Sequence, residues 1–141
     1  SIYLIDDYAH HPTEVLAYFE SLKKSFPHHK IFFIFQPHTF TRTHFLFNQF
    51  LRIFQKIKKD KKTELIILKT FPSAREKGII VKIKKLKKDI DLAKKVKAMY
   101  FDDEKKLINY LREVQGKSVV ITTVGAGDAY RILESLKTLI K

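Results

Sequence analysis

The sequence of 141 residues contains no cysteine. Without cysteine the chain forms no disulfide bond and no thiolate metal site, and this composition favours a reducing compartment, so we expect a cytoplasmic protein. No apolar run approaches the roughly 20 residues that a membrane-spanning helix requires. The sequence shows no charged segment followed by an apolar run, which is the pattern of a secretion signal, so we expect no such signal. We therefore expect no membrane partner, and the length suits one domain with its own core.

Acidic residues are also scarce, since 15 stand against 28 basic residues and give a net charge of +13. Such an excess raises the hypothesis of a stand-alone module that binds nucleotides or nucleic acid through a basic face. However, 23 of the basic residues are lysines and only five are arginines, the residue type that grips phosphates and bases with paired hydrogen bonds. The composition therefore favours a solvated lysine surface, and we expect no nucleic-acid partner.

Short apolar runs alternate with helical patterns along the chain. Five runs lack polar alternation, which is typical of strands covered on both faces. These runs span 2–5, 31–35, 65–68, 98–101 and 119–123. Apolar stripes with helical spacing occupy 15–22, 47–57, 107–114 and 132–140. The alternation predicts an α/β fold, namely a three-layer Rossmann-like sandwich with a mostly parallel sheet flanked by helices.

The segment 78–96 has the weakest pattern, and we expect a further strand or an irregular piece there, followed by a helix. Four turns that are rich in polar and titratable residues follow predicted strands. They read DDYAHHP from Asp6, QPHTFTRT from Gln36, FPSARE from Phe71 and VGAGD from Val124. Because ligands of parallel sheets bind beyond the carboxyl ends of the strands, these turns predict a single binding site.

The first turn also has a structural interpretation. Asp6 and Asp7 can cap the helix that follows, in which Pro12 suits the first position and Glu14 lies near the positive helix end. The histidines of the turns do not show the spacing of a zinc motif, so we predict no metal ligands.

The VGAGD turn contains two glycines of the dinucleotide-binding pattern GxGxxG, but Tyr130 stands at the third glycine position. A glycine turn at the start of a helix can still admit an anion. No GxxxxGK[ST] phosphate loop occurs in the sequence, so we do not expect this chain alone to hold a nucleoside triphosphate firmly.

The motifs DDYAHHPTE, FQPHTFTRT, SAREKG and VGAGD, in this order and spacing, resemble the carboxyl-terminal domain of the Mur ligase family. Within this family the second motif is most similar to that of the ligases that add L-alanine to UDP-N-acetylmuramate. The ligases that recycle the murein tripeptide share a similar first motif and are the nearest alternative. The resemblance spans nearly the whole chain and is weakest over 79–96. Some members carry arginine where this sequence has Thr39.

The resemblance implies a cytoplasmic, ATP-dependent ligase of peptidoglycan synthesis, acting through an acyl phosphate that the amine of L-alanine attacks. ATP and Mg²⁺ are then the cofactors, and UDP-N-acetylmuramate and L-alanine the substrates. It also implies that 1–141 form the third domain. The amino-terminal UDP-sugar domain and the central ATPase domain, which binds most of the ATP and Mg²⁺, are absent from this chain, so we expect the fragment to be inactive. A start at Ser1, directly before a strand-like run, agrees with a piece of a longer protein.

The resemblance also assigns roles to site residues. His38 and Arg42 are the expected catalytic residues, and together with Tyr8 they are expected to bind the amino-acid substrate. Arg42 offers a planar, permanently charged donor for a carboxylate, and histidine is able to exchange a proton near neutral pH. Asp7, Tyr8 and His10 are expected at the nucleotide, with Asp7 accepting hydrogen bonds from the ribose. Because Arg42 is predicted near a helix start, its charge would oppose the helix dipole unless an anion compensates.

Overall fold

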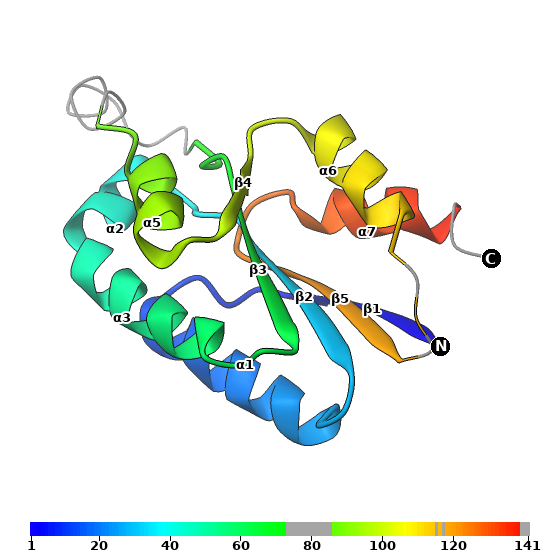
Figure 1. The fold of residues 1–141 in the computed structure, drawn as a ribbon. Coiled ribbons are helices and arrows are strands. Elements are labelled where there is room, and N and C mark those ends of the chain that lie inside the picture. Colours follow the sequence, from blue (N-terminus) through cyan, green and yellow to red (C-terminus); the bar gives the residue numbers. More distant parts are fainter. Residues whose placement is uncertain (73–85, 115, 117, 139–141) are drawn as a thin grey trace.

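Five strands and the helices between them alternate along the chain (Figure 1). The computed structural model describes residues 1–72, 86–114, 116 and 118–138. The elements are β1 (Ile2–Asp7), α1 (Pro12–Ser25), β2 (Lys30–Phe35), α2 (Phe40–Phe45), α3 (Phe47–Lys58), β3 (Thr63–Leu68), α5 (Lys88–Val96), β4 (Met99–Phe101), α6 (Glu104–Arg112), β5 (Val119–Val124) and α7 (Tyr130–Lys137). The predicted α/β class is therefore confirmed, including a helix at the end of 78–96.

The sheet has five strands in the order β1-β5-β2-β3-β4, and every pairing within it is parallel. All five predicted strands are present, and a mostly parallel sheet was expected. The predicted strand 2–5 was too short, because Asp6 and Asp7 continue the β1 ladder opposite Thr123 and Val124. The strand that was an open alternative before α5 falls in 73–85, outside the described residues, as does most of the FPSARE turn.

Helices cover both faces of the sheet and make it a three-layer sandwich (Figure 1). The core on one face joins side chains of α1, α3 and α5 to those of the central strands. On the other face, side chains of α6 and α7 pack on β2, β3 and β5. The central strand β2 serves both cores, because Phe33 and Phe35 point to the first and Phe32 and Ile34 to the second. Both faces of β2 are therefore buried, as its apolar run predicts.

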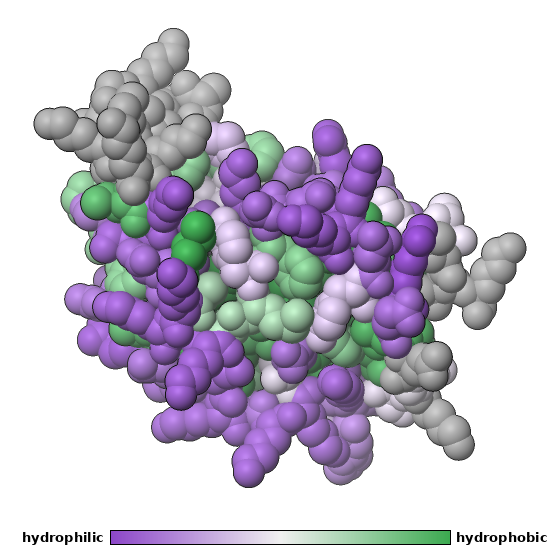
Figure 2. Space-filling model, turned by 45° about the horizontal axis from the view of Figure 1, so that its top comes forward, coloured by the Kyte–Doolittle hydropathy of each residue, from purple (hydrophilic) through white to green (hydrophobic). Residues whose placement is uncertain are grey.

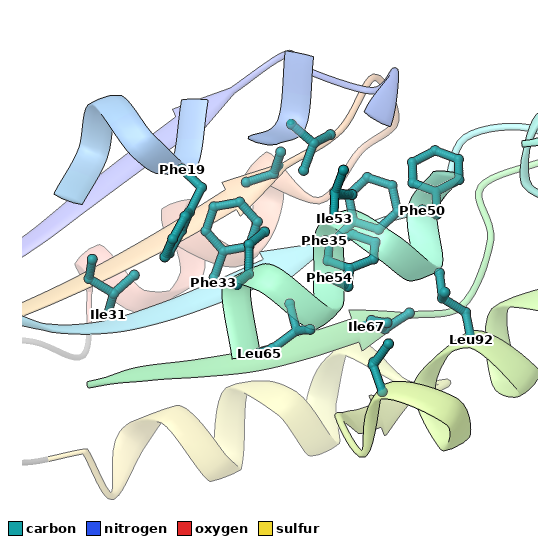
Figure 3. Close-up of a cluster of buried hydrophobic side chains, with 14 of the residues drawn as sticks. Phe19, Ile31, Phe33, Phe35, Phe50, Ile53, Phe54, Leu65, Ile67 and Leu92 are labelled. Carbon is teal, nitrogen blue, oxygen red and sulfur yellow. The ribbon is translucent and has the colours of Figure 1, made fainter. Parts of the chain in front are cut away.

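Aromatic rings fill much of the first core (Figure 3). The Phe35 ring lies 5.0 Å from that of Phe54 and 5.4 Å from that of Phe50, and Phe33 meets Phe19 edge-on at 5.5 Å. Side chains of this size bury 150–250 Å² each, roughly, and carry most of the burial energy of a small domain. The core thus fixes β2 and β3 between two helix layers.

The two outer strands do not fit the prediction that all strands are covered on both faces. β4 is only half-buried, and Tyr3 of β1 is 45% exposed. Short apolar runs at a sheet edge and in its centre look alike in sequence, because the missing neighbour is a property of topology.

The first residues of α1 are held by a capping box. His11 is the N-cap residue, its Nδ1 accepts from the Thr13 N–H at 3.4 Å, and Glu14 Oε1 accepts from the His11 N–H at 3.1 Å. The hydrogen bonds from the His11 and His10 backbone lower the pKa of Glu14. The capping interpretation of Asp6 and Asp7 is wrong, whereas the predicted places of Pro12 and Glu14 are confirmed.

β5 lies between β1 and β2, so the chain crosses from the far edge of the sheet back into its middle. After β2 it turns toward the face of α3, and after β5 toward the face of α7 (Figure 1). Such a reversal opens a crevice beyond the carboxyl ends of the two strands, where ligands of α/β sheets bind. In the described part of the chain, no helix is long and apolar enough to cross a membrane.

At the opposite edge of the sheet, Asp60 closes the turn before β3 and generates a pH prediction. Its carboxylate accepts from the Thr63 hydroxyl at 2.6 Å and pairs with Lys23 Nζ at 3.0 Å. Burial raises the pKa of Asp60, but the hydrogen bonds from Thr63 and Lys23 outweigh burial and leave it below its ordinary value of 3.8. A lowered pKa means that the ionised carboxylate stabilises the fold above this value and ceases to do so as pH falls below it.

We therefore expect Asp60→Asn to lower the free energy of unfolding at pH 7 by about 1 kcal/mol or less, since solvent screens this half-exposed site. The difference from the unsubstituted chain should shrink as pH falls below about 4. Urea titrations of both chains at pH 7 and pH 3 measure it, and an equal difference at both pH values would contradict the assignment.

Candidate functional site

Three of the four predicted turns meet at the carboxyl edge of the sheet, together with the first two residues of the fourth, Phe71 and Pro72, which are the part of it that the structure describes. The β1, β2 and β5 turns are tied by backbone bonds, because Gly125 N donates to Asp7 O at 3.0 Å and Gln36 N donates to Val124 O at 2.9 Å. The turn after β3 joins them through Phe71, whose N donates to Pro37 O at 2.8 Å. With the top of Figure 1 turned forward, Figure 2 shows weakly polar and apolar surface surrounded by hydrophilic side chains. The edge is therefore one connected surface.

Four rings from three of these turns form a row, which we call the ring row: Tyr8, His10, His38 and Phe71. Neighbouring ring centres lie 5.2 Å, 6.5 Å and 5.7 Å apart in that order. The first two pairs meet edge to face, and His38 stacks on Phe71 with 14° between the planes. Tyr8, at the outer end, is 69% exposed. The structure thus brings the rings of three predicted site residues and of Phe71 together, each next to the following one.

Arg42 also reaches the ring row, since its Nη1 lies 3.5 Å from His38 Nδ1. A guanidinium only donates hydrogen bonds, so His38 Nδ1 is the acceptor in this contact. The predicted place of Arg42 near a helix start is confirmed, because it is the third residue of α2 and its N–H is capped by Thr39. α2 has only six residues, so Arg42 belongs to its last turn as well and the helix-dipole argument decides nothing. A partly buried charge held beside a histidine at an open edge is suited to an anionic ligand.

The backbone between His38 and Arg42 is strained at Thr39. Its φ of 65° with ψ of 139° is rarely adopted by a β-branched residue. Two interactions hold it there: Thr39 N donates to Phe71 O at 3.0 Å, and Thr39 Oγ1 accepts from Arg42 N at 3.2 Å. Strain of this kind costs about 1–3 kcal/mol and concentrates at functional sites. The same contacts fix the start of α2 relative to His38.

Gln36 clamps the β5 turn to the end of β2. Its side chain is nearly buried, its Nε2 donates to Asp128 Oδ1 at 3.0 Å, and its Oε1 accepts from Ala129 N at 3.0 Å. Gly125 and Gly127 pack directly against this clamp, and Gly125 has a φ of +143°. The glycines of VGAGD thus serve close approach. The turn is a poor anion site, because Asp128 is itself acidic and the Ala129 N–H already has an acceptor.

Beyond Phe71 a hollow of about 360 Å³ opens toward the end of β4. Lys69 lines it together with four acidic residues, Asp102, Asp103, Glu104 and Asp128. Burial and the charge of Asp128 raise the pKa of Glu104, which indicates net negative surroundings. A ligand phosphate or carboxylate is therefore better placed on the Arg42 side of the ring row.

Asp7 lies at the end of β1, which β5 separates from β2. Its Oδ2 accepts from the Ala9 N–H at 3.0 Å. A carboxylate is able to accept more hydrogen bonds than this one. His10 Nδ1 donates to the Tyr8 carbonyl at 3.0 Å, so the ring row is anchored to the same turn. The structure thus places Asp7 in the same turn as Tyr8 and His10 but not in the pair of His38 and Arg42.

Among the described residues, no three acidic or histidine side chains are grouped so that they could hold a metal ion. His11 caps α1 rather than facing His38. Phe71 and the Gln36 side chain were not predicted as site residues. Both stand in the polar turns. For Gln36 the available signal was a polar residue directly after a strand that is predicted to be buried.

These features define an α/β domain in which polar turns meet at the switch point of a parallel sheet and Arg42 lies beside His38. Residues 1–127 match the Mur ligase family in its glutamate ligase domain. The chain belongs to this family, and the predicted resemblance is confirmed.

Sequence relatives point to one branch of the family. The chain is 43% identical over 137 residues to UDP-N-acetylmuramate–L-alanine ligase of Clostridium botulinum strain Hall and 35% identical over 133 residues to that of Desulfitobacterium hafniense. These matches cover 95% and 94% of this chain but only 28% of each relative. The chain thus spans little more than a quarter of the relatives' length.

Solved structures share the fold. The L-alanine ligase of Thermotoga maritima aligns with a TM-score of 0.60 at 23% identity, covering 97% of this chain and 27% of its own. A murein peptide ligase of Psychrobacter arcticus aligns with a TM-score of 0.59 at 15% identity, over 98% of this chain and 27% of its own. At these identities the likeness concerns the fold alone.

The close packing of Gly127 generates a second prediction. An added Cβ would lie 2.8 Å from Cβ and Cγ of Phe71 and would also collide with Gln36 Oε1. We expect Gly127→Ala to destabilise the chain by about 1–3 kcal/mol and to displace Phe71 from His38. Urea denaturation and the NMR signals of the Phe71 ring measure the two effects. Unchanged stability together with unmoved Phe71 signals would refute the packing role.

Proposed function

We propose that this chain is the carboxyl-terminal domain of the ligase that joins L-alanine to UDP-N-acetylmuramate in peptidoglycan synthesis. The observation that carries the proposal is the contact of Arg42 with His38 at the ring row, because it offers a carboxylate site and a proton acceptor side by side. The matches to L-alanine ligases at 35% and 43% identity support the choice of substrate.

The proposal includes the rest of the enzyme. We assign the UDP-sugar and ATP phosphate sites to parts of the protein outside this chain, since the chain spans 28% of its relatives and has no phosphate loop. We assign Mg²⁺ to those parts as well. The full enzyme would work in the cytoplasm, where ATP is available.

Arg42 would bind the carboxylate of L-alanine in this proposal. A guanidinium and a carboxylate form two parallel hydrogen bonds, which fix the orientation of the amino acid as well as its position. When Arg42 turns to the carboxylate, its contact with His38 Nδ1 would be given up, and this nitrogen would be the acceptor that the proton needs. His38 would then hold or take up the proton that the attacking amine must lose.

Tyr8, His10 and Asp7 would meet the nucleotide. The residues present suit its nucleoside end: the Asp7 carboxylate is able to accept ribose hydroxyls, and the exposed ring of Tyr8 offers a flat apolar surface. ATP would supply the phosphoryl group that activates the sugar carboxylate. The domain's own contribution would be to close over the reacting groups and exclude water from them.

The main test is Arg42→Ala in the full-length enzyme. Loss of a charged hydrogen-bond pair is worth about 1.5–3 kcal/mol, so the KM for L-alanine should rise roughly tenfold to a hundredfold. The constants for ATP and UDP-N-acetylmuramate should change much less. Arg42→Lys should recover only part of the loss, because a point charge does not reproduce the planar fork.

Arg112→Ala is the matched control, because Arg112 is exposed at the end of α6 and lies outside the ring row and its hydrogen bonds. It should leave all three constants unchanged, and circular dichroism should show an intact fold for every variant. Equal losses for all three substrates with Arg42→Ala, or no change for L-alanine, would overturn the role of Arg42. Preference of the unsubstituted enzyme for the murein tripeptide over L-alanine would favour the recycling ligase instead.

A further prediction concerns the 141-residue chain by itself. Because it has no phosphate loop, it should hydrolyse no ATP, form no amide bond and bind ATP only weakly. Calorimetry and a phosphate-release assay test this, with the full-length enzyme as the positive control. ATP binding in the micromolar range by the isolated chain would contradict the assignment of the phosphate site to another part of the protein.

A further inference from the structure

A buried carboxylate lies behind the ring row. Asp89, in the first turn of α5, is only 7% exposed and has no cation among its hydrogen-bond partners in the described residues. Its Oδ2 accepts from both the N–H and the hydroxyl of Thr70 at 2.9 Å and from the Tyr100 hydroxyl at 3.3 Å. Oδ1 accepts from Ile90 N at 2.8 Å. A carboxylate withdrawn this far from water is retained only when donors surround it.

Asp89 and the side chains that donate to it come from three separate parts of the chain. Thr70 follows β3, Tyr100 lies within β4, and Asp89 itself stands at the start of α5. Burial, the charge of Asp89 and its hydrogen bond all raise the pKa of Tyr100, so the phenol stays a donor at neutral pH. The side chain of Asp89 thus links the end of β3 and the strand β4 to the start of α5.

Thr70 passes this constraint to the ring row, because its neighbour in sequence is Phe71. Phe71 makes a parallel bridge with His38 and donates its N–H to Pro37 O at 2.8 Å. Phe71 O accepts from the strained Thr39 at 3.0 Å, and the Phe71 ring stacks on His38. The backbone of Phe71 is therefore held between Asp89 on one side and the His38 turn on the other.

We infer that Asp89 is a positioning residue of the site, which sets the orientation of the His38 ring through Thr70 and Phe71. The hydrogen bonds of Asp89 to described residues go to Thr70, Ile90 and Tyr100 and to no member of the ring row, so its effect on His38 is transmitted by the backbone of 70–71. The value of this position for catalysis rests on the proposed function, whereas the coupling between Asp89 and His38 does not. A misplacement of about 1 Å at such a site is able to cost roughly a hundredfold in rate.

The test is Asp89→Asn in the 141-residue chain, followed by NMR with ¹⁵N-labelled histidine. An amide has one acceptor oxygen where the carboxylate has two, and its nitrogen cannot accept from Thr70. We expect the ring signals of His38 to shift and the cross-relaxation between the His38 and Phe71 rings to weaken. The signals of His28, an exposed residue at the other edge of the sheet, should stay in place.

Asp60→Asn is the matched control. Asp60 also accepts a hydrogen bond from a threonine, but that residue, Thr63, is the first of β3, so the substitution loosens the amino end of the strand without touching the Thr70 turn. It should leave the His38 signals unchanged. Tyr100→Phe removes only the 3.3 Å bond to Asp89, and it should shift His38 in the same direction by a smaller amount, even where Asp89→Asn fails to fold.

Unmoved His38 signals in Asp89→Asn or Tyr100→Phe would overturn the inference, and so would equal shifts in Asp60→Asn. Either result would leave the proposed function open to its own test, since that depends on the kinetics of Arg42 variants. The converse result is also informative. If the His38 signals shift in Asp89→Asn and Tyr100→Phe while Arg42→Ala leaves the L-alanine kinetics unchanged, the positioning role is supported and the proposed function is refuted.

Discussion

The pairing of β5 with both β1 and β2 is the constraint on which the rest of the structure depends. It brings the DDYAHHP and VGAGD turns beside the end of β2, although more than a hundred residues separate the first and last strands. The strand is buried throughout, yet it carries Thr122 and Thr123. Their hydroxyls are satisfied by Tyr18 and Asp6, each at 2.6 Å. Burial raises the pKa of Tyr18 to about 12, so this phenol stays protonated at any physiological pH. The hydrogen bonds therefore fix the position of β5 between its neighbours as well as satisfying its polar groups.

The central strands and most helices could be predicted from the sequence because their signals are local. An unbroken apolar run or a stripe at helical spacing reports burial directly. Edge strands gave the same signal, since only the topology decides which strand lacks a neighbour. The meeting of polar turns at one edge could also be predicted, because the carboxyl ends of parallel strands lie at the same edge of a sheet. The clamp of Gln36 on Asp128 joins residues 92 positions apart, and Asp89 reaches Thr70 across 19, so no local pattern announces either. In the lysine-rich segment that contains it, Asp89 looks like a surface charge.

The lysines have structural uses that a count of charges does not reveal. Lys58 donates to the carbonyl of Lys97 at 3.0 Å and so links the ends of α3 and α5. Lys88 and Lys95 of α5 both place their ammonium groups near the Phe47 ring, at 4.9 Å and 5.4 Å. Long aliphatic stems cover apolar surface while the charged ends stay in water. Such contacts account for several lysines of a chain with net charge +13 without any nucleic acid.

The electrostatics of the carboxyl edge differ on the two sides of His38. On one side, Thr39 caps α2 through its hydroxyl and holds the backbone in a strained conformation. Among the described residues, Arg42 is the cation that reaches the ring row, and the acidic hollow beyond Phe71 carries the opposite charge. An anionic ligand is attracted to one side of His38 and repelled from the other, over the width of a single ring. The orientation of such a ligand therefore depends on where the His38 ring stands between the positive charge of Arg42 and the negative charge of the acidic hollow. This is why the backbone contacts that fix it, from Thr39 to Phe71 and from Thr70 to Asp89, matter as much as the charges themselves.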